Sequence, residues 1–127
     1  QNNKRGNGKV GAVGFCWGGG MVNRIAVAAG SLLDAGAAYY GPTPTSAEAA
    51  TVKAAMLLHY AGNDDRVNGG AGAWVDALRK AGVAVTRYDY PGTEHAFNND
   101  TSEARYNKAA ADLAWGRTIA FFKEKLG

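Results

Sequence analysis

The 127-residue chain has little of what marks the more specialised classes of protein. Its single cysteine, Cys16, excludes an internal disulfide and a metal site built from several cysteines, and it suits a reducing compartment. No apolar run approaches the length that crosses a membrane, and no signal-peptide pattern is present. The net charge is only +3, and the basic residues are scattered rather than gathered into the stripe that binds nucleic acid. We therefore expect one cytoplasmic domain over residues 1–127, with no nucleic-acid or membrane partner, no cofactor and no metal.

What the chain does have is a strong local pattern at residues 9–22, KVGAVGFCWGGGMV. The apolar run over residues 10–15 predicts a buried strand, and the glycines around Cys16 predict a sharp turn into a helix. The spacing from Gly14 through Cys16 to Gly18 matches the nucleophile elbow G-x-S-x-G, with cysteine in place of serine. Such a turn strains its central residue and places it beside the positive end of a helix, which favours the nucleophilic thiolate.

Two simpler interpretations of this turn stay open. A lone cysteine in an apolar strand is most often a small core residue. A glycine-rich turn between a strand and a helix also binds phosphate groups. The choice depends on whether the rest of the chain supplies partners for a nucleophile.

The remaining segments alternate between strand and helix patterns. Strands are predicted over residues 10–15, 32–40, 54–60 and 83–90, the last of them ended by Pro91 and Gly92. Helices are predicted from just beyond Cys16 through residues 21–29, over about 71–82 and over about 102–126, with a loop and a short helical turn over residues 43–50. This alternation predicts an α/β fold, in which a mostly parallel sheet carries helices on both faces.

The last predicted helix carries two further signals. Its apolar stripe is expected to face the core and consists of Ala111, Trp115, Ile119, Phe122 and Leu126. Asp100 and Glu103 are expected to form a capping box at its start.

Three residues of the types that act in nucleophilic catalysis follow just after predicted strands. In a parallel sheet the carboxyl ends of the strands meet at one edge, and this places Cys16, Asp64 and His95 together in the α/β-hydrolase order of nucleophile, acid and histidine. A thiol nucleophile needs such a base, and the base needs an orienting acid. Asp65 is the rival acid, and the unused aspartate is expected to cap the following helix. The other histidine, His59, lies within an apolar strand and is interpreted as a hydrogen-bonded core residue.

Three blocks of the sequence resemble the dienelactone hydrolase (carboxymethylenebutenolidase-like) family of α/β-hydrolases. They are GFCWGGG at residues 14–20, YAGNDDRVN at 60–68 and YPGTEHAFNNDTSEARYNKAAADLAW at 90–115. The resemblance implies that Cys16 is the nucleophile, that His95 is the base, and that Asp64 rather than Asp65 is the acid. It also implies hydrolysis of small esters or lactones through an acyl-thiol intermediate, with the backbone N–H of Trp17 as an oxyanion donor.

The resemblance further implies substrate contacts at Tyr39, Phe97 and Asn99. Tyr39 belongs to the family-like segment Tyr-Tyr-Gly at residues 39–41. In the enzyme that gives the family its name, an arginine four residues after the histidine helps hold the substrate carboxylate. Asn99 stands at that position here, and a neutral amide cannot form the bidentate charged clamp. Dienelactone itself is therefore not the expected substrate.

Members of this family carry several strands before the elbow strand, whereas fifteen residues precede Cys16 here. We therefore expect an α/β-hydrolase fold that lacks its N-terminal strands, its second oxyanion donor and part of its substrate pocket. The strand at residues 10–15 would then have an open edge. We expect the chain to form a homo-oligomer there or to bind a chain that supplies the missing strands. The alternative function is a catalytically silent fragment or binding module that keeps the elbow as a structural relic.

Overall fold

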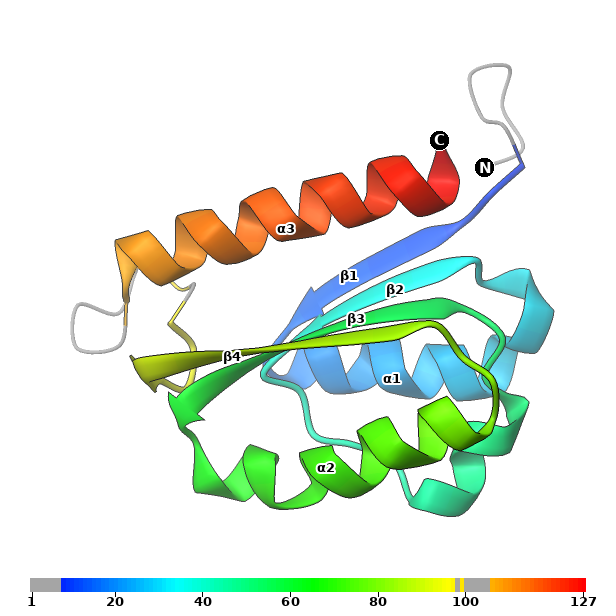
Figure 1. Ribbon diagram of the computed structural model, residues 1–127, viewed down its shortest axis with the longest axis horizontal. Helices are drawn as coiled ribbons and strands as arrows, with labels where there is room; N and C mark the ends of the chain where they lie inside the picture. Colours follow the sequence, from blue (N-terminus) through cyan, green and yellow to red (C-terminus); the bar gives the residue numbers. More distant parts are fainter. Residues whose placement is uncertain (1–7, 98, 100–105) are drawn as a thin grey trace.

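Four strands and their intervening helices make up the computed structural model, which describes residues 8–97, 99 and 106–127. In chain order the elements are β1 (Gly11–Phe15), α1 (Trp17–Ala29), η1 (Gly30–Leu32), β2 (Ala35–Tyr39), η2 (Ser46–Thr51), β3 (Ala55–Asn63), α2 (Asp65–Lys80), β4 (Val85–Glu94) and α3 (Lys108–Leu126). All neighbouring strands are parallel, and they lie in the order β1-β2-β3-β4 (Figure 1).

Helices cover both faces of this sheet. α1 and α2 lie against one face, and α3 crosses the other (Figure 1). The connections between successive strands run along the face that carries α1 and α2, so that each new strand is added on the same side of the last. The predicted fold class, a parallel sheet with helices on both faces, is confirmed.

Several predicted boundaries are wrong at the ends nearest the candidate site. β3 runs to Asn63 rather than to residue 60, and α2 begins at Asp65 rather than near residue 71. β4 does not end at Pro91 but continues to Glu94. β4 is an edge strand, where a proline need not break the hydrogen-bonded ladder. α1, by contrast, begins at Trp17 directly beyond the turn, as the elbow pattern predicts.

α3 buries only part of the apolar stripe that the sequence predicts: Ala111 is buried and Phe122 and Leu126 pack against the core, but the middle of the stripe does not face the sheet. Its buried residues are Ala110, Ala111, Ala114, Thr118 and Phe121. Trp115 and Ile119 stay 45% and 38% exposed. The reason is polar, because the Thr118 hydroxyl bonds to groups of the sheet and thereby sets the rotation of the helix.

The start of α3 also differs from the prediction. The helix begins at Lys108, and the side chain of Asn107 accepts a hydrogen bond from the backbone N–H of Ala110. Asn107 therefore provides the N-cap. The predicted capping residues Asp100 and Glu103 lie outside the described residues.

The larger part of the core lies between the sheet and the layer of α1 and α2. It is built from apolar side chains of the strands and both helices, including Val22, Ala26, Met56, Leu58, Trp74 and Leu78. β2, with the sequence AGAAY, is buried along its whole length. Its small side chains let the helical layers on both faces approach the sheet closely.

A buried polar network joins α3 to the other face of the sheet. His59 has no exposed surface, and its Nδ1 and Nε2 lie 2.8 Å from the Tyr90 hydroxyl and 3.0 Å from Thr118 Oγ1. Thr118 also bonds to the Tyr39 hydroxyl at 2.8 Å and donates to the Ala114 carbonyl. The Thr118 hydroxyl donates its only proton to that carbonyl. His59 Nε2 must therefore donate to Thr118, and Nδ1 must accept from the Tyr90 hydroxyl, as in a neutral imidazole. The interpretation of His59 as a hydrogen-bonded core residue is confirmed.

This network makes stability depend on pH. Burial, with the charge of Arg117 adding to it, lowers the pKa of His59 from 6.5 to about 3. The folded chain therefore keeps His59 neutral in a range where the unfolded chain takes up a proton. The stabilising contribution is complete above pH 6.5 and is lost progressively as the pH falls toward 3.

We predict that the free energy of unfolding falls by about 2 kcal/mol from this group between about pH 7 and pH 5. Urea titrations at both values measure the difference. In His59→Gln, which keeps a polar side chain without an ionisable group, the difference should shrink by that amount. An equal loss of stability in both proteins would show that His59 is not its source.

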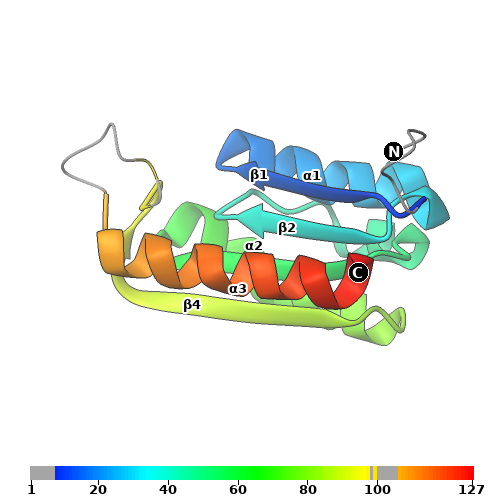
Figure 2. The same cartoon turned by 90° about the horizontal axis from the view of Figure 1, so that it is seen from above.

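An apolar surface is left uncovered beside β1. Figure 2 shows β1 at one edge of the sheet, beside β2. Val13 and Phe15 are 41% and 37% exposed there, and Trp115 and Ile119 lie on the helix face that continues to Phe122, whose ring lies close to Gly11. Among the described strands β1 pairs with β2 only, so its other edge presents unpaired backbone groups.

We predict that the purified chain self-associates through this edge. Sedimentation should show an average mass that rises with concentration. Val13→Lys should weaken the association, because a charge on a free strand edge opposes pairing. Ile25→Lys is the matched control, since Ile25 on α1 is also 41% exposed. A monomer of unchanging mass over the micromolar range would contradict the prediction.

Candidate active site

The turn between β1 and α1 holds Cys16 in an unusual backbone conformation. β1 ends at Phe15 and α1 begins at Trp17, so Cys16 alone makes the change of direction. Its φ of 57° and ψ of −118° lie in a region that non-glycine residues rarely adopt. The thiol is exposed. The strained turn predicted from the sequence is therefore present, and Cys16 is not a small core residue.

Close packing of backbone against backbone explains the glycines of this turn. A Cβ on Gly14 would collide with the carbonyl oxygen of Gly18, and a Cβ on Gly19 would lie 2.6 Å from the carbonyl oxygen of Tyr39. A Cβ on Gly18 would meet nothing within 4 Å. The glycines needed for the close approach are thus Gly14 and Gly19, rather than the pair of the G-x-C-x-G spacing.

The candidate base, His95, follows β4, at the opposite edge of the sheet from β1, and contacts Cys16. His95 Nε2 lies 2.9 Å from Cys16 Sγ, across 79 positions of sequence. His95 Nδ1 contacts Asp64 Oδ2 in a short hydrogen bond. With Nδ1–H donated to the carboxylate, Nε2 is free to accept the thiol proton. The structure thus brings the three predicted residues into one hydrogen-bonded chain.

The ends of β3 and β4 hold the acid and the histidine in place. The pairing of these strands shifts register between Ala61 and Asn63, one residue before Asp64. The buried Thr93 stabilises the irregular stretch: its hydroxyl accepts from the Gly62 N–H and donates to the Tyr90 carbonyl. β4 therefore extends past Pro91, and His95 is the first residue after the strand.

Tyr40 is a contributor that the sequence interpretation did not single out. Its ring centroid lies 5.0 Å from that of His95 and 5.2 Å from that of Phe97. It has a φ of 38° and is 1% exposed. Tyr40 packs against the imidazole and limits its movement. The available signal was its place in the family-like segment at residues 39–41.

The two aspartates have distinct positions. Asp64 is 7% exposed and bonds to His95. Asp65 is exposed and is the first residue of α2. Asp64 stands at the N-cap position without using its side chain as a cap, so the expected capping aspartate is absent from this helix.

The three predicted substrate contacts lie in different surroundings. Tyr39 and Phe97 have no exposed surface: Tyr39 bonds to Thr118, and Phe97 packs against Tyr40 and Tyr90. In this structure both belong to a buried aromatic cluster with Tyr40 and Tyr90 and offer no surface to a ligand. Asn99 is exposed, and its backbone N–H donates to the Ala96 carbonyl.

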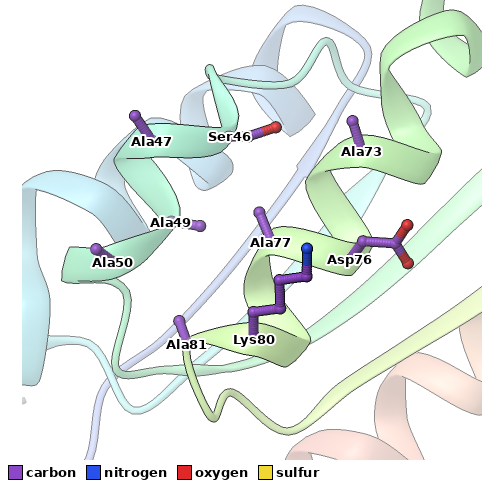
Figure 3. Close-up of a pocket in the computed structure, with 9 residues that line it drawn as sticks. All are labelled: Ser46, Ala47, Ala49, Ala50, Ala73, Asp76, Ala77, Lys80 and Ala81. Atoms are coloured by element: carbon purple, nitrogen blue, oxygen red, sulfur yellow. The ribbon is translucent and has the colours of Figure 1, made fainter.

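Two hollows lie near α1 and α2. A groove of about 180 Å³ begins at Trp17, the residue after Cys16, and runs along α1 opposite Pro42 and Pro44. A wider hollow of about 670 Å³ lies between η2 and the C-terminal half of α2 and is lined mostly by alanines (Figure 3). It contains none of Cys16, Asp64 and His95. Over the described ranges, no three side chains of the metal-binding types gather closely enough to hold a metal ion.

Comparison with known proteins assigns the chain to a family. The sequence profile of the "Dienelactone hydrolase family" matches residues 1–126. The chain belongs to the dienelactone hydrolase family. The resemblance seen in the three sequence blocks is confirmed, and the chain is a member of a family of hydrolases.

Several relatives of this dienelactone hydrolase-family chain extend over most of its length. It is 37% identical to Protein usf of Aquifex pyrophilus over 122 residues, which are 93% of this chain and 52% of that protein. It is 41% identical over 103 residues to the "Putative carboxymethylenebutenolidase" of Azospirillum brasilense, covering 80% of this chain and 44% of that one. The chain spans about half the length of these curated relatives.

The fold is also found in solved structures. A dienelactone hydrolase-like promiscuous phosphotriesterase from metagenomic libraries superposes with a TM-score of 0.85 at 22% identity, over 94% of this chain and 54% of that one. None of the helices in the described part of the chain is both long and apolar enough to span a membrane.

We predict that two glycine substitutions at the turn affect the stability of the fold differently. Gly14→Ala should destabilise the fold by about 2–3 kcal/mol, because the new methyl group meets backbone that cannot move aside. Gly18→Ala should leave stability unchanged or raise it by up to about 1 kcal/mol, since alanine is favoured within a helix and has open space here. Urea unfolding measures both. Equal destabilisation by the two variants would contradict this account of the turn.

Proposed function

We propose that the chain carries the catalytic centre of a hydrolase for small esters or lactones, with Cys16 as nucleophile, His95 as general base and Asp64 as orienting acid. The observation that supports this most directly is the unbroken line of hydrogen bonds from Cys16 Sγ through both nitrogens of His95 to Asp64. A sulfur, an imidazole and a carboxylate in this sequence form a nucleophile with its proton acceptor and the group that orients the acceptor.

The first half of the reaction transfers the acyl group to sulfur. His95 Nε2 takes the proton of Cys16, and the thiolate attacks the carbonyl carbon of the ester. The negative charge that develops on the carbonyl oxygen is stabilised by the backbone N–H of Trp17, one of the unpaired donors at the start of α1. The carbon–oxygen bond of the ester then breaks, and the leaving oxygen takes the proton from His95.

The second half releases the acid. His95 takes a proton from a water molecule, and the resulting hydroxide attacks the thioester carbonyl. The carbon–sulfur bond breaks, the acid leaves, and Cys16 regains its starting state with the proton returned through His95. Asp64 accepts a hydrogen bond from Nδ1–H throughout and stabilises the imidazolium that forms in both halves.

The alternative, a silent domain that keeps the elbow as a relic, makes a different prediction about acylation. We expect p-nitrophenyl acetate to release nitrophenolate and to leave an acetyl group on Cys16. Mass spectrometry should locate the acetyl group on this residue. A folded chain that is never acylated at Cys16 would favour the silent domain.

Substitutions of the three assigned residues and their neighbour separate the roles. His95→Ala should lower kcat/KM for this ester by at least about 100-fold, the usual contribution of a general base. Asp64→Asn should lower it by about 10-fold or more, because an amide no longer fixes the imidazole tautomer. Asp65→Asn, a matched change one residue away on an exposed side chain, should stay within about twofold of the parent. If Asp65→Asn is the more harmful of the two, the acid is wrongly assigned.

A further inference from the structure

We propose that Thr93 is a positioning residue of this centre, because its hydroxyl holds β4 in the register that sets His95 beside Asp64. The inference rests on the proposed function and adds to it a residue outside the line from Cys16 through His95 to Asp64. Thr93 is 3% exposed, so its side chain is too buried to touch a substrate and acts from within the fold.

The pairing of β3 with β4 changes register just before the site. Up to Ala61, each paired residue of β3 lies opposite the β4 residue 29 positions later, as Ala61 lies opposite Tyr90. Asn63 instead lies opposite Glu94, which is 31 positions later. Between these two pairs, β4 therefore holds two residues more than β3, as in a β-bulge.

The change of register decides which residue faces the acid. With a difference of 29 positions, Asp64 would lie opposite Thr93 itself. With a difference of 31 positions it lies opposite His95, and the hydrogen bond between Asp64 and His95 spans 31 positions. The pair therefore forms only while β4 keeps its two extra residues before His95.

The Thr93 hydroxyl makes the first contact in the new register. It accepts a hydrogen bond from the Gly62 N–H at 3.2 Å, again across 31 positions. It also donates at 2.6 Å to the carbonyl of Tyr90, the last β4 residue in the old register. The two residues between Tyr90 and Thr93 are Pro91 and Gly92, and neither has a polar side chain. One hydroxyl thus joins the two registers.

Both ends of this link are fixed. Tyr90 is 4% exposed, and its own hydroxyl lies 2.8 Å from Nδ1 of the buried His59. Gly62 lies so close to β4 that a Cβ there would be 2.9 Å from the Tyr90 carbonyl oxygen. Gly62 and Thr93 each stand two positions before a residue of the site. A shift of the linked segment is therefore passed directly to Asp64 and His95.

The next side-chain contact in the new register is weaker. Asn63 Nδ2 donates to Glu94 Oε1 at 3.4 Å, and this contact is exposed. Water competes for such a bond, and its length is beyond the usual range. The buried Thr93 hydroxyl is therefore the stronger restraint on the register.

The test observes the bond between His95 and Asp64 directly and needs no ester. The chain has two histidines, and nitrogen-15 NMR of their side chains distinguishes a protonated ring nitrogen from a bare one. We expect His95 to carry its proton on Nδ1 in the parent chain at neutral pH. Thr93→Val removes the hydroxyl and keeps the branched shape, and it should move the two His95 nitrogens toward the average of both tautomers. His59 should stay protonated on Nε2 and shows that the core is intact.

Ester hydrolysis gives a second readout. Thr93→Val should lower kcat/KM for p-nitrophenyl acetate about 10-fold, because a misplaced base loses the advantage of orientation. Since the hydroxyl acts through Asp64, adding Thr93→Val to Asp64→Asn should lower kcat/KM by less than about a further twofold. Two effects that multiply in full would overturn the proposal.

Matched variants separate the hydroxyl from the shape of the side chain. Thr93→Ser should retain the parent's His95 signals, whereas Thr93→Ala, which differs from it by the hydroxyl alone, should lose them. This pair also gives the answer if Thr93→Val does not fold. Thr51→Val removes a hydroxyl that donates to the Val27 carbonyl at 2.8 Å, and it should leave both readouts unchanged. Parent-like His95 signals in Thr93→Ala, or equal loss in Thr93→Ser, would show that the hydroxyl does not position the histidine.

Failure of the wider function gives a separate result. If the parent hydrolyses no ester but the His95 tautomer depends on the Thr93 hydroxyl, the positioning role stands and the hydrolase is wrong. If the parent hydrolyses the ester and folded Thr93→Val keeps both its activity and its His95 signals, the hydrolase stands and the positioning role is wrong.

Discussion

The structure of the site depends on one close contact, between the first turn of α1 and the carboxyl end of β2. Gly19 approaches the carbonyl oxygen of Tyr39 so closely that no side chain fits between them. This contact confines the change of direction to Cys16 and gives it a φ of 57°. It also places the start of α1, whose first N–H groups have no partner within the helix, directly after Cys16. The position of the thiol, of the Trp17 N–H that is proposed as the oxyanion donor, and of the segment beginning at Pro42 all follow from the same backbone approach.

The opposite half of the site depends on irregularity instead. Beyond the shift in pairing, which the Thr93 hydroxyl bridges, β3 and β4 end side by side with Asn63 paired to Glu94. Asp64 and His95 follow these paired ends and bond to each other. Behind them, Tyr40 and Phe97 form an aromatic support for the imidazole. The Cys16 thiol, held by the strained turn, therefore meets a histidine that is fixed by packing on one side and by a carboxylate on the other. Such preorganisation reduces the entropy that a reaction must otherwise lose.

The sequence predicted the parts of this arrangement that depend on local pattern. The alternation of strands and helices, and the position of Cys16, Asp64 and His95 after three of the strands, follow from hydrophobic periodicity and turn residues. The rotation of α3 could not be predicted in this way. Its apolar stripe through Trp115 and Ile119 is genuine, but the helix faces the sheet with Thr118 because His59 and Tyr39 offer it hydrogen bonds. Those partners lie on β3 and β2, far away in sequence, so no window along the chain contains the information.

The all-parallel order of the strands has a consequence for how the chain reaches this state. No two neighbouring strands are joined by a hairpin, so each pairing closes a long loop and loses chain entropy before its contacts form. Cys16 and His95 come together across 79 residues and three successive pairings. The thiol–imidazole contact is therefore among the most non-local contacts of the fold. During refolding, the environment of Cys16 would report completion of the whole sheet rather than of any local segment.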